Sequence, residues 1–215
     1  MNENEKLPSE REICETYNVS RTTVRQAMDE LEKEGYIYKI HGKGTFVSPK
    51  RMNQDLISFY SFTEEMKKLD KSPSSEVTGF EIVQGDEKIC SIFNMEVDDL
   101  LYRISRIRKA DGLPMMYETT YLPFNRYKGI KKEQLEENPM YDVLIKCFNT
   151  KITSAEEYFM PILTNKLESV YLDIKEGSPS LKIERFTYEN TSLIEYTVSV
   201  ARGDKFKYRV KLNNN

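Results

Sequence analysis

The stretch LPSEREICETYNVSRTTVRQAMDELEKEGYIYKIHGKGTFV, residues 7–47, decides the fold of the first part of this chain. Ser9 followed by Glu12 is a capping-box pattern, which predicts the start of a short helix. Asn18 interrupts that helix, and Ser20 is a suitable N-cap for a second one. These signals predict two helices joined by a tight turn.

Both helices carry an apolar stripe of the kind that packs on a core. In the first helix the stripe consists of Ile13, Cys14 and Tyr17. In the second helix the i, i+3, i+4, i+7 spacing selects Val24, Ala27, Met28 and Leu31. The other face of the second helix is polar, so it is available for a partner.

A short hairpin is expected after the second helix, from strands at 36–40 and 45–47 around the tip HGKG, residues 41–44. The glycines allow the positive φ that a tight hairpin tip needs. Residues 36–51 contain four cations (Lys39, Lys43, Lys50 and Arg51) and no acid. Two helices followed by a basic hairpin predict a winged helix-turn-helix, whose second helix enters the major groove of DNA.

The composition of the chain limits the number of domains and the classes of protein to which it can belong. The chain has 215 residues, enough for two small domains, and a formal net charge of −3, which argues against nonspecific binding of polyanions. No run approaches the ~18 apolar residues of a membrane span, and no signal peptide opens the chain. We therefore expect a soluble cytoplasmic protein without a membrane partner.

Metal and cofactor chemistry is not expected. The three cysteines are far apart in the sequence, and the single histidine is His41. That distribution offers neither the ligand spacing of a zinc site nor a histidine-based catalytic group. No cofactor and no catalytic residue are predicted.

We expect the winged helix-turn-helix to occupy residues 1–48 and a polar linker to occupy residues 49–54. Residues 55–215 then alternate between strand and helix patterns. Strands are expected at 76–83, 100–109, 115–122, 152–163, 180–189, 193–202 and 206–212. A helix opened by Asn138 and Pro139 is among those expected between the strands. The pattern predicts an α+β domain, a mainly antiparallel sheet with helices on one side.

The strings LPSERE, VSRTTVRQAMDELEKEGYI and HGKGTFVS, in this order, resemble the DNA-binding domain of the GntR family of bacterial transcription regulators. That family normally has another helix before LPSERE. Only residues 1–6 precede it here, so the domain is expected to lack its first helix.

The DNA contacts follow from the helix-turn-helix and the wing. Base edges should be read by the polar face of the second helix, that is by Arg21, Thr22, Arg25 and Gln26, and Thr23 is a further DNA-binding candidate there. Phosphates should be contacted by Arg11, Lys39, Lys43 and Thr45. Gly42 and Gly44 would let the wing backbone approach the DNA, and His41 either reaches the minor groove or stays in solvent.

From residue 55 onward the chain resembles the UTRA effector-binding domain of the HutC subfamily of these regulators. The strings that carry this resemblance are SFTEEM, YRISRIRKADGLPMMYETTYLP, GSPSLKIERFTY and YTVSVARGDKF. The UTRA fold is similar to chorismate lyase. The whole chain is therefore expected to be α+β, an N-terminal winged helix-turn-helix followed by a mainly antiparallel UTRA domain.

One ligand site is indicated by the residues themselves. Arg106 and Arg108 are two apart on an expected strand, so their guanidiniums share a face, as they would for an anion. A two-residue turn would place Tyr117 opposite Arg106, whereas a three-residue loop would place Glu118 there. Pro114 cannot donate a ladder hydrogen bond, which favours the wider loop.

The resemblance implies further effector-binding residues. In sugar-phosphate-responsive members, two such arginines bind the phosphate and the next strand supplies an acid. The matching positions here, together with the loop that closes on the phosphate, a helix residue and an acid near the sugar, are Arg106, Arg108, Glu118, Ser61, Phe62, Thr63, Tyr141 and Glu195. Asn138-Pro139 and Ala201 stand where some relatives have a serine and a tyrosine, so the part of the site that selects the ligand is altered.

The sequence thus predicts a ligand-responsive transcription regulator, a repressor that binds a palindromic operator in double-stranded DNA as a homodimer. Its effector would be a small anion, a sugar phosphate above all. One alternative is an effector-binding and dimerisation protein with impaired DNA binding. The other is a chorismate lyase-like enzyme.

Overall fold

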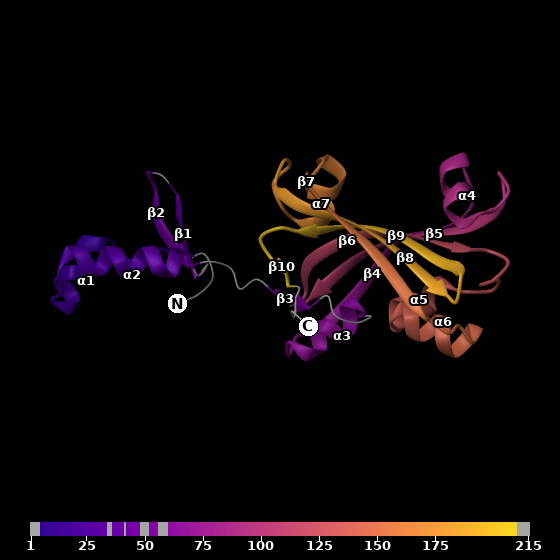
Figure 1. Ribbon diagram of the computed structural model, residues 1–215, viewed down its shortest axis with the longest axis horizontal. Helices are drawn as coiled ribbons and strands as arrows, with labels where there is room; N and C mark the ends of the chain where they lie inside the picture. The colour runs from indigo at the N-terminus through magenta and orange to yellow at the C-terminus, as the bar shows by residue number, and fades with distance from the viewer. Residues whose placement is uncertain (1–4, 34–35, 41, 48–51, 56–59, 210–215) are drawn as a thin grey trace, which may run out of the picture. The chain divides into compact units, whose positions relative to one another are not determined.

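The computed structural model describes residues 5–33, 36–40, 42–47, 52–55 and 60–209, and the following account is confined to them. The chain divides into two compact units, Met1–Met52 and Asn53–Asn215 (Figure 1). Part of the expected linker, residues 49–51, lies outside the described residues, whereas residues 52–54 lie in a strand, β3 (Met52–Asp55). Each unit is described by itself.

The first unit contains the two helices that the sequence predicts, α1 (Glu10–Tyr17) and α2 (Arg21–Lys33). The capping box is confirmed: the Glu12 amide donates to Ser9 Oγ at 3.3 Å, and the Ser9 amide donates to Glu12 Oε2 at 2.7 Å. Ser20 Oγ accepts from the Thr23 amide at 3.1 Å and so caps α2. Local sequence therefore determines where both helices begin.

The wing is the hairpin of β1 (Ile37–Ile40) and β2 (Gly44–Val47). Gly42 and Gly44 have φ values of 74° and 120°, as the tip requires. A segment that the sequence analysis did not assign runs along β2: the Leu7 amide donates to Thr45 O at 2.9 Å. His41 lies outside the described residues.

The core of the first unit is small. Its buried apolar members are Val24, Met28 and Ile37, with Leu7, Ile13 and Cys14 partly buried around them. The predicted stripes were wrong at their edges, because Tyr17 is 72% exposed and Ala27 and Leu31 are also exposed. The cause is the limited cover: within residues 5–47, as far as they are described, the elements that pack on α2 cover only one part of its apolar side.

The second unit is built on an antiparallel sheet of six described strands in the order β4-β5-β6-β9-β8-β7. Their bounds are Pro73–Gln84, Leu100–Ala110, Leu113–Pro123, Ser192–Arg202, Pro179–Glu189 and Ser154–Leu163. A separate two-stranded sheet joins β3 to β10 (Phe206–Arg209). The prediction of a mainly antiparallel α+β domain is confirmed.

Helices cover both faces of the six-stranded sheet, so the prediction of helices on one side was wrong (Figure 1). One face, called here the pocket face, carries α3 (Phe62–Lys68), α5 (Lys132–Glu137) and α6 (Met140–Phe148). The outer face carries α4 (Glu87–Phe93) and α7 (Lys166–Leu172). None of the helices in the described ranges is long and apolar enough to cross a membrane.

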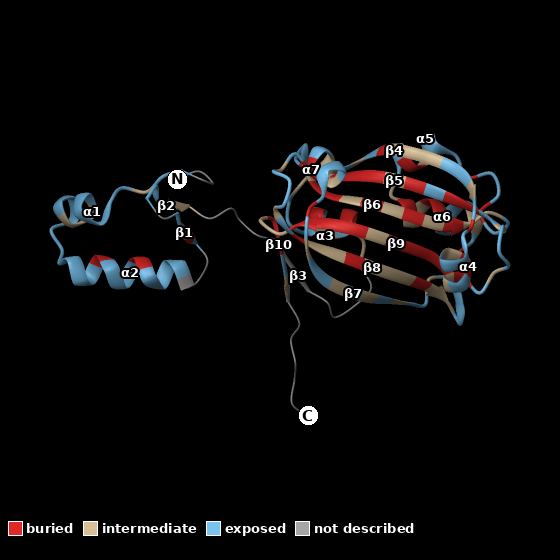
Figure 2. Ribbon diagram, turned by 90° about the horizontal axis from the view of Figure 1, so that it is seen from above, coloured by how far each residue is buried: buried red, intermediate tan, exposed pale blue. Residues whose placement is uncertain are grey.

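The reason for cover on both faces is that the central strands are apolar on both. Ile104 and Leu122 pack under α5 and α6, whereas Leu101 and Tyr196 pack under α4. Figure 2 shows the result as long buried stretches along β5 and β9, in contrast to the mostly exposed α1 and α2.

The start of α6 also differs from expectation. Asn138, predicted to cap α6, instead ends α5, a helix the sequence analysis missed, and its amide donates to Gln134 O at 3.0 Å. Pro139 then takes the N-cap position of α6. Because Pro139 disfavours the helical conformation in the residue before it, Asn138 is extended.

The hairpin of β5 and β6 fixes the ligand site. Its turn has two residues, Asp111 and Gly112, with φ values of 51° and 78°, so the predicted three-residue loop was wrong. Nevertheless, Arg106 lies opposite Glu118, the pairing that the wider loop was meant to give. The register shifts just beyond Arg108, where a β-bulge adds the one residue that the turn lacks.

Candidate functional site

The residues predicted to read DNA bases gather in the first two turns of α2. Their side chains are all exposed: Arg21, Thr22, Thr23, Arg25 and Gln26. Thr23 is partly occupied, because its hydroxyl lies 2.9 Å from Ser20 Oγ in the helix cap. The two arginines and Gln26 present donor groups that suit base edges in a major groove.

Two of the predicted phosphate contacts already have acidic partners. Arg11 Nε lies 2.8 Å from Glu15 Oε1, and Lys39 Nζ lies 2.8 Å from Glu32 Oε2 and 3.0 Å from Asp29 Oδ1. Hydrogen bonds to Glu32 and then Asp29 raise the pKa of Lys39. Exposed pairs of this kind are weak, so a DNA phosphate can replace the acids.

The wing supplies the remaining predicted contacts. Lys43 and Gly42 are exposed at its tip, Gly44 is exposed, and Thr45 is half-buried on β2. A Cβ on Gly44 would meet Lys6 Cε at 2.8 Å, so the chain passes close to itself here. The DNA-binding roles of α2 and the wing stay predictions.

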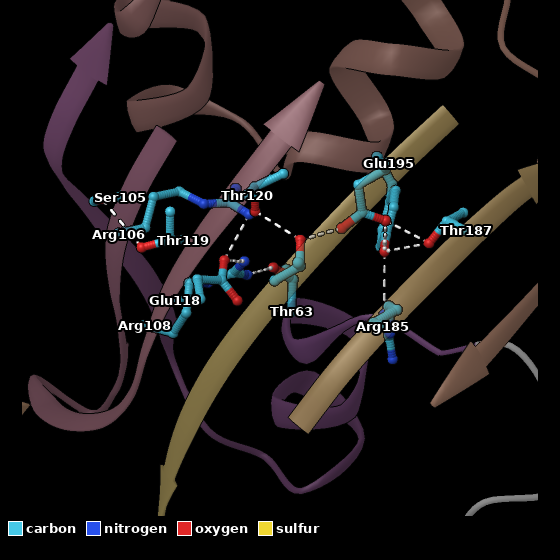
Figure 3. Close-up of polar contacts among 12 residues, drawn as sticks. Thr63, Ser105, Arg106, Arg108, Glu118, Thr119, Thr120, Arg185, Thr187 and Glu195 are labelled. Atoms are coloured by element: carbon cyan, nitrogen blue, oxygen red, sulfur yellow. Dashed lines mark hydrogen bonds and ion pairs between the residues drawn. The ribbon is translucent and has the colours of Figure 1, made fainter. Parts of the chain in front are cut away.

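In the second unit the eight residues predicted to bind an effector line one pocket on the pocket face of the sheet. Figure 3 labels Thr63, Arg106, Arg108, Glu118 and Glu195 among them. They come from the start of α3, from β5 and β6, from α6 and from β9: Ser61, Phe62, Thr63, Arg106, Arg108, Glu118, Tyr141 and Glu195. The structure thus brings together positions that are up to 134 residues apart.

One end of the pocket, called here the arginine end, holds two guanidiniums on a single carboxylate oxygen. Arg106 Nη2 lies 2.5 Å and Arg108 Nη1 lies 3.1 Å from Glu118 Oε1. These side chains are 2%, 8% and 7% exposed. The arginine end therefore carries a buried excess of one positive charge.

The pKa values of the residues at the arginine end are set by burial and by their charged neighbours. Burial would raise the pKa of Glu118, but the two guanidiniums outweigh it and hold that pKa below its usual value. Burial, with repulsion from Arg106, lowers the pKa of Arg108 against the attraction of Glu118. Among the described residues, the Nε atoms of both arginines have no hydrogen-bond partner. An incoming anion would compensate the excess positive charge and would supply hydrogen-bond acceptors.

The arginine end also holds the start of α3. Arg108 Nη2 donates to Thr63 Oγ1 at 3.0 Å, and its guanidinium lies 4.9 Å from the centre of the Phe62 ring. Ser61 caps α3 by accepting from the Glu64 amide at 3.2 Å. The predicted phosphate loop is thus attached directly to a predicted phosphate-binding arginine.

The opposite end of the pocket is rich in hydroxyls. Glu195, only 1% exposed, accepts hydrogen bonds from Tyr141 Oη at 2.9 Å and from the hydroxyls of Thr187 and Thr197. Thr197 in turn is hydrogen-bonded to Thr120 at 2.7 Å. A carboxylate surrounded by hydroxyls can accept donors from a polyol ligand in the same way.

The sequence analysis missed three charged or polar residues at this hydroxyl end: Tyr60, Glu157 and Arg185. Arg185 donates from Nε to Glu157 Oε1 at 2.7 Å and from Nη1 to Tyr141 Oη at 3.1 Å. Burial would lower the pKa of Arg185, but the Tyr141, Glu157 and other acidic groups around it raise that pKa well above its usual value.

A sequence signal for Arg185 existed in the string LKIERFTY. Its alternation places Arg185 between Ile183 and Thr187 on one face of β8, and both of those are buried. Opposite Arg185 the register places Thr197 on β9 and Glu157 on β7. What the sequence could not supply was the register that sets Arg185 between Glu157 and Thr197 on the two adjacent strands.

Comparison with known proteins identifies the two units. A family model described as "Bacterial regulatory proteins, gntR family" matches residues 1–47, and one described as "UTRA domain" matches residues 68–207, well over half of the chain. The chain belongs to the GntR family of bacterial regulatory proteins. A UTRA domain follows the helix-turn-helix in the sequence, as the quoted stretches of sequence predicted.

Individual relatives agree with this assignment. The chain is 34% identical over 203 residues to the HTH-type transcriptional repressor NagR of Bacillus subtilis, covering 94% of this chain and 83% of that one. It is 27% identical to the mannosyl-D-glycerate transport/metabolism system repressor MngR of Escherichia coli, covering 94% and 84%.

Among solved structures, PhnF from Mycobacterium smegmatis is similar with a TM-score of 0.76 and 26% identity, covering 100% of this chain and 95% of that one. NagR and MngR are both named as repressors. The chain is accordingly a transcription regulator and not an enzyme, which removes the chorismate lyase-like alternative.

Proposed function

We propose that this GntR-family regulator is a repressor controlled by a small anionic metabolite, most readily a sugar phosphate. Its first unit would bind operator DNA through Arg21, Arg25 and Gln26, and its second unit would bind the metabolite. The relatives NagR and MngR are both named as repressors. The protein would act in the cytoplasm, where its DNA target lies.

The observation that carries the ligand assignment is the arginine end of the pocket. Two nearly fully buried guanidiniums share one oxygen of Glu118, which leaves one positive charge uncompensated among them. Burying such an excess costs several kcal/mol, roughly, unless a further anion arrives. A phosphate ester supplies that anion and matches the fork of Arg106 and Arg108.

The hydroxyl end supports a sugar as the rest of the ligand. Glu195, Glu157 and the threonine hydroxyls of β8 and β9 offer the acceptors and donors that a polyol needs. The names of several relatives also concern sugars, including a probable fructoselysine utilization operon repressor of Escherichia coli that is 24% identical to this chain. Ala201 and Asn138-Pro139 remain our candidates for differences in ligand choice.

We further propose that the regulator acts as a homodimer on a palindromic operator. Two recognition helices then require half-sites about one helical turn, or a multiple of it, apart. An effector that binds one arrangement of the dimer about a hundredfold better shifts the equilibrium by about 2.7 kcal/mol. That suffices, because both helices must dock simultaneously.

The test uses the whole chain, a duplex selected in vitro from random DNA, and a thermal-shift panel of glucosamine 6-phosphate, a disaccharide phosphate and inorganic phosphate. We expect at least one sugar phosphate to stabilise the wild type and to change its DNA affinity. Arg106→Ala should lose this response and keep its DNA binding in the absence of ligand.

The matched control is Arg103→Ala. Arg103 lies on the same strand, forms a comparable pair with Glu81 on β4, and faces the other way. It should respond to the sugar phosphate like the wild type. Normal calorimetric binding of the sugar phosphate by Arg106→Ala would refute the pocket assignment, and failure to select any duplex would refute the regulator.

A further inference from the structure

The start of α3 is attached to the pocket at two places, and only one of them is explained by anion binding. At the arginine end, Arg108 holds Thr63 and Phe62. At the hydroxyl end, Arg185 holds Tyr60, the residue with which the described chain resumes after the segment that leads from the first unit. The second attachment has no role in the function proposed so far.

Three residues form this second attachment, and we call them the tyrosine clasp: Tyr60, Glu157 and Arg185. Arg185 Nη1 donates to Tyr60 O at 3.0 Å, and its guanidinium lies 4.3 Å from the centre of the Tyr60 ring. Tyr60 Oη donates to Glu157 Oε2 at 2.5 Å. Both charged members are only 12% exposed, so these contacts are not weakened by solvent.

The clasp is connected to the ligand site by a direct hydrogen bond. Arg185 also donates to Tyr141 Oη, which donates to Glu195. A ligand hydroxyl that takes the place of Tyr141 on Glu195, or of Tyr60 on Arg185, therefore changes the bonds that hold Tyr60. Occupancy of the hydroxyl end and the position of Tyr60 cannot vary independently.

A fourth residue, Tyr208 on β10, lies beside the clasp with an unused donor. Its ring packs on Phe159, with centroids 4.9 Å apart, and Phe159 lies two residues from Glu157 on the same face of β7. Burial raises the pKa of Tyr208, so its hydroxyl keeps its proton. Within the part of the chain that the structure describes, its buried hydroxyl has no hydrogen-bond partner.

The strand that carries Tyr208 is also the partner of the strand at the boundary between the units. β10 pairs with β3, and the two compact units divide at Met52 and Asn53, the first residues of β3. Tyr60 follows β3 in the sequence. A change at Tyr60 and Tyr208 thus acts on both sides of the segment through which the chain enters the second unit.

We propose that the tyrosine clasp is the switch by which a bound sugar phosphate alters DNA binding, with Glu157 accepting from Tyr60 in the ligand-free state and from Tyr208 in the ligand-bound state. This inference rests on the ligand-responsive function proposed above. Each state gives Glu157 one phenolic donor and leaves the other tyrosine without it. The two states then differ by only a few kcal/mol in favour of the ligand-free one, a difference that a ligand with greater affinity for the other state can overcome.

Two conservative substitutions test the switch because they act in opposite directions. Tyr60→Phe keeps the ring over Arg185 and removes only the ligand-free bond. Glucosamine 6-phosphate should then bind at least roughly tenfold more tightly, since a hydrogen bond to a charged carboxylate is lost from the competing state. Tyr208→Phe removes only the ligand-bound bond, so binding should weaken by a similar factor.

DNA affinity provides the second measurement, by fluorescence anisotropy on the selected duplex. Without ligand, Tyr60→Phe should shift the affinity toward that of the liganded wild type, whereas Tyr208→Phe should leave it within about twofold of the wild type. The control is Tyr121→Phe, on the outer face of the sheet, which should change neither quantity.

The outcomes separate the switch from the function on which it rests. Opposite shifts in ligand affinity support the switch, because loss of a mere packing or ligand contact would weaken binding in both variants. Shifts in the same direction, or wild-type behaviour in both variants, overturn it. If the wild type neither binds a sugar phosphate of the panel nor responds to it on DNA, the proposed function itself fails, and the switch with it.

Discussion

The two units place their arginines in opposite environments. Arg21 and Arg25 project into solvent from α2, whereas Arg106 and Arg108 lie almost fully buried around Glu118. An exposed guanidinium costs little and can reach a large polyanion such as DNA. A buried pair needs its own counter-charge and can reach only what fits the pocket. Under the proposed function, the same side chain would therefore serve a macromolecule in one unit and a small molecule in the other.

The two units also differ in the size of their hydrophobic cores. Of its described residues, the first unit buries three apolar side chains, Val24, Met28 and Ile37. The second unit has apolar clusters on both faces of its sheet, around Ile104 and around Leu101. A small core leaves a thin margin of stability. We therefore expect the DNA-binding unit to be the more easily unfolded of the two.

The largest effect that would sharpen this comparison is expected from Glu118→Gln. Removing the carboxylate leaves two buried guanidiniums without their counter-charge, which should cost about 3–5 kcal/mol of the free energy of unfolding. Denaturant unfolding at neutral pH measures this. Glu81→Gln, which breaks the exposed pair with Arg103, should cost under about 1 kcal/mol.

The pH dependence of stability, compared between the wild type and Glu118→Gln, gives a second check on the role of Glu118. The pKa of Glu118 is held below its usual 4.5, so the carboxylate contributes stability above that pH and loses it as the pH falls through the lower folded value. Glu118→Gln lacks this contribution at every pH. The difference in stability between wild type and variant should shrink in acid, and a constant difference would contradict the assignment.

In the first unit the comparable effect should come from the core and not from a charge. Met28→Ala should destabilise this unit by about 2–5 kcal/mol, because Met28 is 4% exposed and contacts the small cluster around Val24. Amide hydrogen exchange of α2 in the whole chain measures it. Leu31→Ala is the control, and its exposed side chain should matter far less.

Arg25→Ala should separate binding from folding. Because Arg25 is exposed, the free energy of unfolding should change by less than about 0.5 kcal/mol. Affinity for the selected duplex should nevertheless fall by about 1–3 kcal/mol and base preference should relax. A mobility-shift titration decides this, and unchanged binding would remove Arg25 from the reading set.

The smallest expected effect is at the cap of α1. Ser9→Ala removes the Oγ that accepts from the Glu12 amide and donates to Glu12 Oε2 at 2.8 Å, at a cost of about 1 kcal/mol, while the bond from the Ser9 amide to Glu12 stays. Hydrogen exchange at the first turn of α1 should rise accordingly. Ser9→Thr keeps the hydroxyl and should keep most of the protection.

What the sequence predicted well was local. Ser9, Ser20 and the wing glycines act on the few residues around them, and the structure has the elements where these residues indicate. The apolar stripes were less reliable, because Tyr17 and Leu31 depend on whether another element covers them. Periodicity shows which side of a helix is apolar, but not how much of that side is buried.

The pocket was predictable where its residues lie on one hairpin. Arg106 and Arg108 are close in sequence and alternation alone places them on one face, whereas Glu118 joins them only because the bulge offsets the two-residue turn. Arg185 and Glu157 were missed because their association depends on how β7, β8 and β9 are ordered in the sheet. That order is a property of the whole domain, and no short string records it.

The bulge between the tight turn and Glu118 has a consequence for mutations that change the length of β6. Side chains on a strand alternate, so gaining a single residue there, with the bulge unchanged, would rotate every later position of β6 to the opposite face. Tyr117 would then stand beside the guanidiniums, and the carboxylate would point toward α7. An in-frame insertion of one codon would thus leave a foldable hairpin whose pocket lacks its carboxylate, whereas loss of the bulged Met115 would keep Glu118 opposite Arg106.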